Sequence, residues 1–137
     1  MEKKTFKCHK ISEGVAEGEA IISKDDMCFY LIDPSTGTII EPAHSLEGKS
    51  MANKILIFPS GKGSSVVQAD GLYQLNLNGN SPKAMIIKYA ETVLVSSAII
   101  MEVPMVDKVE EEFYNIVKDG DFVRVDADND TIEILDR

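Results

Sequence analysis

The sequence predicts an α/β fold, and the main evidence is the order of segments in the middle of the chain. A short apolar run over residues 55–58 is followed by a glycine-rich turn, a segment with helical spacing, and a second apolar run over residues 84–87. This order is typical of two parallel strands joined by a right-handed helical crossover. The chain has 137 residues, 44% of them hydrophobic. That length suits one core and is too short for two typical domains, so we expect a single domain over residues 1–137.

The charge of the chain restricts its partners. The formal net charge is −9 at pH 7, whereas nucleic acids and anionic membranes are bound through basic surfaces. No apolar run approaches the roughly 18 residues that span a bilayer, and the first residues lack the apolar stretch of a secretion signal. We therefore expect a cytoplasmic protein with no nucleic-acid or membrane partner, in which a local site holds any small anionic ligand.

The first third of the chain predicts strands, a turn and a loop. Two strands, Thr5–Ile11 and Gly18–Lys24, are expected on either side of a glycine-containing turn, and Met27–Ile32 is a candidate third strand. The segment Asp33–Gly37 begins with Asp-Pro and ends in glycine, which predicts a tight turn. The segment Glu41–Ser50 is polar and has neither helical nor strand periodicity, so we expect a surface loop.

The segment after the glycine-rich turn has helical spacing. Its apolar side chains fall near one helical face, with two leucines beside them: Val66, Ala69, Tyr73 and Leu77, and then Leu72 and Leu75. The sequence Asn-Gly-Asn at residues 78–80 ends this helix, because these residues tolerate the left-handed conformation. The remaining predicted elements are a short buried helix at Glu91–Met101, a strand at Pro104–Asp107, a helix or ordered loop at Glu110–Val117, and a terminal hairpin of Phe122–Val125 and Thr131–Leu135.

The turn itself, residues 59–65, is the best candidate for a functional site. A proline and two glycines stop the first apolar run, and Ser64 and Ser65 stand where the helix begins. Unpaired backbone N–H groups and the positive end of the helix dipole then converge beside these hydroxyls and Lys62, which suits an anion. The alternative is that a serine merely caps the helix. Lys62 lies between the two glycines instead of preceding a serine, so the turn does not match a nucleotide-binding P-loop.

Other candidate residues give weaker signals. The chain's two cysteines, Cys8 and Cys28, have no second pair, so they neither frame a disulfide scaffold nor supply the ligands of a metal site, and no metal is expected in this chain. A Ser-His-carboxylate triad would need a histidine at the turn. His9 lies in a predicted strand, and a solvated or capping role is favoured for His44.

The chain resembles the small subunit of the aconitase X family over nearly its whole length. The resemblance lies in a set of short stretches: Gly18-Glu19-Ala20, Asp33 to Gly37, Leu46 to Ser50, Lys54 to Ser65, Asn78 to Ile86, Pro104 to Asp107, and Gly120-Asp121. It implies a swivelling β/β/α domain like the mobile C-terminal domain of aconitase, with a mixed sheet or barrel and flanking helices. It also implies docking on a separate large subunit that holds an iron–sulfur cluster, with no cofactor bound by this chain alone.

The same resemblance assigns roles to the turn. Aconitase-like enzymes present a serine in a Gly-x-Gly-Ser-Ser segment, and the segment from Gly61 to Ser65 has that form. The resemblance implies that Ser64 is the proton acceptor and that Gly61, Lys62, Gly63 and Ser65 bind substrate. Val66 stands where aconitase-like segments continue with an arginine, so Lys62 or an arginine of the large subunit would have to supply the positive charge.

The reaction implied is the dehydration of (R)-5-phosphomevalonate to trans-anhydromevalonate 5-phosphate in an archaeal mevalonate pathway, with iron as Lewis acid on the leaving hydroxyl. Two alternatives stay open. The first is the small subunit of a cis-3-hydroxy-L-proline dehydratase. The second is a non-catalytic binding module of the same fold, in which Ser64 only caps a helix.

Overall fold

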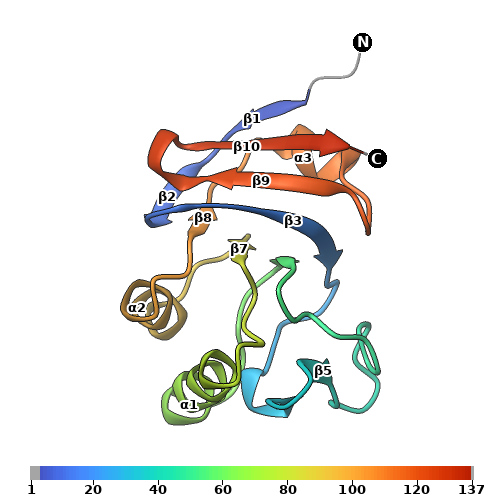
Figure 1. The fold of residues 1–137 in the computed structure, drawn as a ribbon, viewed down its shortest axis with the longest axis vertical. Coiled ribbons are helices and arrows are strands. Elements are labelled where there is room, and N and C mark those ends of the chain that lie inside the picture. The colour runs from blue at the N-terminus through green and yellow to red at the C-terminus, as the bar shows by residue number, and fades with distance from the viewer. Residues whose placement is uncertain (1–3, 137) are drawn as a thin grey trace.

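The computed structural model describes residues 4–136 and confirms the α/β fold (Figure 1). Residues 1–3 and 137 of the predicted domain lie outside the described residues. A mixed eight-stranded sheet has the order β1-β10-β9-β3-β6-β7-β8-β2. Its strands are β1 (Thr5–Lys7), β2 (His9–Ser12), β3 (Val15–Ile22), β6 (Ile55–Phe58), β7 (Ala84–Ile87), β8 (Met105–Asp107), β9 (Phe122–Asp126) and β10 (Thr131–Asp136).

The sheet is closed by its first two strands. β1 and β2 stand at opposite ends of the strand order but are separated in the chain by Cys8 alone. β1 pairs antiparallel with β10, and β2 pairs antiparallel with β8. The predicted strand Thr5–Ile11 is therefore two strands, because the segment changes partners at Cys8, whose N–H donates to the Asp130 carbonyl at 3.0 Å. This continuous segment makes the sheet barrel-like.

The predicted parallel pair lies in the middle of the sheet. β6 pairs in parallel with β7, and the strands on either side of them, β3 and β8, extend the parallel part. Helix α1 (Ser65–Leu77) connects β6 to β7, and helix α2 (Thr92–Ile100) connects β7 to β8. Every residue of β6 and β7 is buried, as expected for strands that are covered on both faces.

Alternate residues of β6 point into two separate cores. Ile55 and Ile57 pack inside the barrel with residues of β9, β10 and helix α3 (Glu111–Ile116). Leu56 and Phe58 face the opposite layer, which holds α1, α2 and the short 3-10 helix η1 (Phe29–Leu31). Figure 1 shows α1 and α2 on this side, away from the antiparallel strands. The glycine turn therefore leaves β6 between the two layers.

The predicted strand at Met27–Ile32 is wrong. Met27 makes only an isolated bridge to Gly61, and η1 follows it. Tertiary packing overrides the strand propensity of these residues, because Phe29 is fully buried and its ring packs edge-on against Phe58 at 5.9 Å. The predicted turn after it is confirmed, since it joins the short strands β4 (Ile32–Asp33) and β5 (Thr38–Ile39).

Helix α1 is confirmed, but the face expected from its apolar residues is not the buried one. Val66 and Tyr73 are 78% and 50% exposed, and Leu77 is also exposed. The side that faces the protein carries Gln68, Gly71, Leu72 and Leu75. A Cβ atom on Gly71 would lie 2.4 Å from the carbonyl carbon of Phe29, so the missing side chain lets α1 lie directly against the η1 backbone.

The other predicted elements are found with small changes. The α2 helix is buried on one side only, through Leu94, Ser97 and Ala98, whereas Ile99 and Ile100 are exposed. Helix α3 and strand β8 lie within the predicted ranges, and the two strands of the β9–β10 hairpin each extend one residue beyond theirs. The 41–50 segment is an irregular loop, as predicted, although the side chains of His44 and Leu46 are buried. Among residues 4–136, no helix is long and apolar enough to cross a membrane.

Candidate active site at the glycine turn

The glycine turn lies at the carboxyl end of β6 and is held by backbone contacts on both sides. On one side, the Ser60 hydroxyl donates to the Tyr89 carbonyl at 2.8 Å, and the Tyr89 N–H donates to the Pro59 carbonyl at 2.8 Å. On the other side, Met27 donates its N–H to the Ser60 carbonyl and accepts from the Lys62 N–H, at 2.9 and 3.0 Å. The turn is therefore fixed by segments that are distant in sequence.

Ser64 is the N-cap of α1. Its backbone is extended, with φ −70° and ψ 159°, and its side-chain oxygen accepts the Val67 N–H at 3.4 Å. The capping role raised from the sequence is thus present, but this contact is longer than a typical N–H···O hydrogen bond. Ser64 and Ser65 are both exposed, with no acidic residue in the first turn of α1. The Ser64 hydroxyl accordingly faces solvent at the positive end of a 13-residue helix.

Both glycines of the turn are required by its geometry. Gly63 has φ +104°, a conformation that side-chain-bearing residues rarely adopt. A Cβ atom on Gly61 would lie 2.1 Å from Oε1 of Gln68 and 2.6 Å from Cδ1 of Leu94. The backbone therefore comes close to the layer of helices, and its N–H groups are not screened by side chains at these two positions.

Lys62 is engaged by the 41–50 loop. Its Nζ atom lies 2.5 Å from Oε2 of Glu41, and the lysine side chain is 43% exposed. The hydrogen bond to Glu41 raises the pKa of Lys62, and the charges of Glu41 and Asp25 add to this effect. The ammonium group stays protonated near neutral pH, but a carboxylate of this chain already shares its charge.

Gln68 lies beneath the turn and was not singled out from the sequence. The residue is 4% exposed, and its Nε2 donates to the Gly63 carbonyl at 3.3 Å. Its Oε1 is buried and, within residues 4–136, has no hydrogen-bond donor. Helical spacing could have indicated that Gln68 is buried, because it shares a helical face with Gly71, Leu72 and Leu75, the other residues that α1 buries.

The two histidines have structural partners away from Ser64. The Nδ1 atom of His44 accepts the Leu46 N–H at 3.0 Å, which leaves its Nε2 to donate to the Asp26 carbonyl at 3.1 Å. The Nδ1 atom of His9 lies 2.7 Å from Oδ1 of Asp107. A Ser-His-carboxylate arrangement is therefore not formed by the described residues.

The residues present do not fit an iron–sulfur cluster. Both cysteines are free, and only partly exposed. Burial is the main reason that the pKa of Cys8 is raised to about 12, which disfavours the thiolate that binds iron. Within the part of the chain that the structure describes, no group of three or more His, Cys, Asp or Glu side chains could hold a metal ion.

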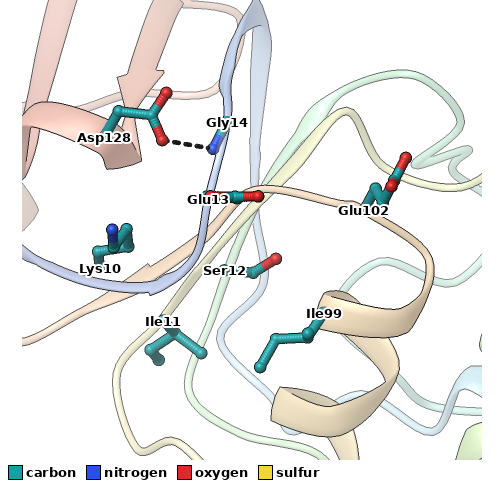
Figure 2. A pocket seen from close by; sticks show the side chains of 8 residues that line it. All are labelled: Lys10, Ile11, Ser12, Glu13, Gly14, Ile99, Glu102 and Asp128. Atoms are coloured by element: carbon teal, nitrogen blue, oxygen red, sulfur yellow. Dashed lines mark hydrogen bonds between the residues drawn. The ribbon is translucent and has the colours of Figure 1, made fainter.

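A separate pocket away from the turn is shown in Figure 2. Its volume is about 640 Å³, and it lies between the β2–β3 turn, the end of α2 and the β9–β10 turn. Three carboxylates and one lysine line it, namely Glu13, Glu102, Asp128 and Lys10. This excess of negative charge disfavours an anionic substrate. None of residues 61–65 contributes to the pocket.

Comparison with known proteins identifies the family. The profile described as "Aconitase X swivel domain" matches residues 5–134. This chain belongs to the aconitase X swivel domain family. The match confirms the resemblance seen in the sequence, including the swivelling α/β fold. Of the five predicted site residues of this swivel domain, Gly61 is partly buried, and Lys62, Gly63, Ser64 and Ser65 are exposed.

Relatives of the swivel domain match it over nearly their full length. The phosphomevalonate dehydratase small subunit of Methanocella arvoryzae is 46% identical over 94% of this chain and 98% of its own. The protein of the same name from Methanococcoides burtonii is 41% identical over 96% of each chain. The crystal structure of Thermococcus kodakaraensis aconitase X in its holo-form has a TM-score of 0.88 at 42% identity, covering 98% of this chain and 100% of that chain.

Proposed function

We propose that this chain is the small subunit of a heteromeric hydro-lyase that dehydrates (R)-5-phosphomevalonate to trans-anhydromevalonate 5-phosphate in the archaeal mevalonate pathway. The observation that carries the proposal is the full-length similarity to small subunits named for this enzyme, at 41–46% identity in the two relatives above. The exposed glycine turn at a helix N-terminus supports it, because both the phosphate and the carboxylate of this substrate are anions.

Ser64 is the proposed proton acceptor. The dehydration removes a proton from the carbon beside the carboxylate and a hydroxyl group from the next carbon. A serine hydroxyl is a poor base unless its alkoxide is stabilised, and the N–H groups of the turn and the dipole of α1 act in that direction. Gly61, Gly63 and Ser65 would bind substrate through backbone N–H groups and a hydroxyl, and Lys62 through its ammonium group. The close pairing of Lys62 with Glu41 makes a second cation from the large subunit part of the proposal.

The large subunit is the proposed partner, and it would hold the iron–sulfur cluster. Two observations support this division. The related chains are named as small subunits, and the described residues of this chain offer no cluster ligands. The turn is also exposed on the isolated chain, so a second surface is needed to exclude water from the reaction. A cytoplasmic location and a single swivelling domain over residues 1–137 belong to the same proposal.

Co-expression with the large subunit tests the proposal. The purified complex is incubated with (R)-5-phosphomevalonate and, separately, with cis-3-hydroxy-L-proline, and loss of one water is followed by mass spectrometry. We expect turnover of phosphomevalonate alone. Turnover of the proline derivative alone would replace the substrate and keep the hydro-lyase assignment. A stable complex that is inactive on both substrates would favour a binding module.

A further inference from the structure

We propose that Gln68 is a positioning residue for the turn, and that its side-chain amide orients the Gly63–Ser64 peptide so that the Ser64 N–H points at a bound oxyanion. This inference rests on the proposed function, because the oxyanion is taken to be the carboxylate or phosphate of the substrate. The role proposed for Gln68 follows from its contacts.

The choice of glutamine at this position needs an explanation beyond packing. Gln68 lies on the buried face of α1, where the neighbouring positions carry Leu72 and Leu75. It is 4% exposed, and its Oε1 has no donor among the described residues. A buried carbonyl oxygen without a partner is unfavourable, so an apolar residue would suit packing alone better. The reason for an amide at this position must therefore be the hydrogen bond made by its Nε2 atom.

The other end of the amide holds the turn. Nε2 of Gln68 donates to the Gly63 carbonyl at 3.3 Å, and the backbone N–H of the same residue donates to the Ser64 carbonyl at 3.0 Å. One residue thus fixes two consecutive carbonyl groups. The absence of a side chain at Gly61 makes room for this arrangement, because a Cβ atom there would lie 2.1 Å from Oε1.

The direction of the N–H groups follows from peptide geometry. In a trans peptide the C=O and N–H bonds point in opposite directions. The Gly63 carbonyl points inward to Gln68, so the Ser64 N–H points outward, to the side where the Ser64 side chain is exposed. Within residues 4–136 the N–H groups of Ser64 and Ser65 have no protein acceptor. They are left directed at a ligand.

Donors held in this way act on the rate more than on binding. When the carbon beside the substrate carboxylate loses its proton, negative charge builds up on the carboxylate oxygens. Donors already aimed at those oxygens stabilise that charge in the transition state, and deleting one such donor costs about 100- to 1,000-fold in kcat. Misaligning a donor by loss of the Gln68 amide should lower kcat at least about tenfold, with a smaller change in KM.

The test uses the complex with the large subunit and two variants of this residue. Gln68→Leu replaces the amide with an apolar side chain of similar size that cannot donate to Gly63, and we expect kcat to fall at least about tenfold. Gln68→Glu donates only when its carboxyl group is protonated, so its kcat relative to wild type should rise as pH falls. Gln74→Leu, on the same helix, is the matched control and should retain wild-type kinetics.

The outcomes separate positioning from packing. A Gln68→Leu complex with kcat within twofold of wild type, or a Gln68→Glu ratio that does not change with pH, would overturn the inference. If Gln68→Leu does not fold, the Gln68→Glu profile decides alone. A second measurement needs no substrate: in the full-length small chain, the NMR amide signals of Ser64 and Ser65 should shift or broaden in Gln68→Leu and not in Gln74→Leu. That result would stand even if phosphomevalonate is not the substrate.

Discussion

Ser64 has a structural role and a proposed chemical role, and two substitutions separate them. Ser64→Ala removes both the capping oxygen and the hydroxyl. Ser64→Asn removes the hydroxyl but supplies another capping oxygen, because asparagine and serine are equally favoured at N-cap positions. Capping residues contribute about 0.5–2 kcal/mol, and the 3.4 Å contact to Val67 places Ser64 near the lower end of this range. We expect Ser64→Ala to lower Tm by about 2–4 °C and Ser64→Asn to leave it unchanged.

The expected effect on the reaction is much larger than the effect on the cap. A general base contributes about 100- to 10,000-fold to the rate, which corresponds to about 3–5 kcal/mol of activation free energy. Both Ser64→Ala and Ser64→Asn should therefore lower kcat at least about 100-fold, although only the alanine variant is less stable. Initial rates on phosphomevalonate and thermal melts of the same purified complexes measure the two effects side by side.

A second capping residue provides the control for stability alone. Asp126 accepts the Asn129 N–H at 3.1 Å in the β9–β10 turn of the barrel. Asp126→Ala should lower Tm to a similar extent while kcat stays at the wild-type value. If either Ser64 variant retains kcat within tenfold of wild type, the hydroxyl is not the proton acceptor, and capping would be its whole role.

Two further predictions concern the packing of α1 and the thiol of Cys8, which lies between β1 and β2. Alanine is normally about 1 kcal/mol more favourable than glycine inside a helix. Gly71→Ala should nevertheless destabilise the chain by about 1–3 kcal/mol, because its Cβ would collide with the Phe29 carbonyl. Urea unfolding measures the change in the free energy of unfolding, and a gain in stability would contradict the reasoning. Burial raises the pKa of Cys8 from 9.0 to about 12, so in a Cys28→Ala background its alkylation rate should keep rising with pH up to about 12. Because the thiol of the unfolded chain ionises near pH 9, the contribution of Cys8 to stability is lost as pH rises from about 9 to 12. An alkylation rate that levels off near pH 9 would refute the raised pKa.

The parts of the fold that sequence predicted are those defined by contiguous residues. The all-apolar β6 and β7, the glycines between β6 and α1, and the Asn-Gly-Asn end of the helix each signal their structure within a few positions. The β9–β10 hairpin is local in the same way. The position of the candidate site at the carboxyl end of β6 followed directly from this order of elements.

The orientation of α1 could not be predicted from hydropathy. The buried side of the helix includes Gly71, where a missing side chain lets the η1 backbone come close, and Gln68, which is polar. Neither glycine nor glutamine has the hydrophobic side chain expected of a core residue. The more apolar Val66 and Tyr73 lie on the exposed side instead. The division of the first predicted strand at Cys8 could not be predicted either. It depends on pairing with β10 and β8, which lie about a hundred residues away in the chain.

Long-range contacts also determine the electrostatics of the site. The sequence placed Lys62 beside Ser64, but only the fold brings Glu41 to its ammonium group. With that charge shared, the turn offers backbone N–H groups and a helix dipole of about half a unit charge, within a chain of net charge −9. Two anionic groups on the substrate and an alkoxide on Ser64 exceed what this supply can balance. If Ser64 is the proton acceptor, the missing positive charge must therefore come from outside this chain. A cation from the large subunit is for this reason as necessary to the proposed mechanism as Ser64.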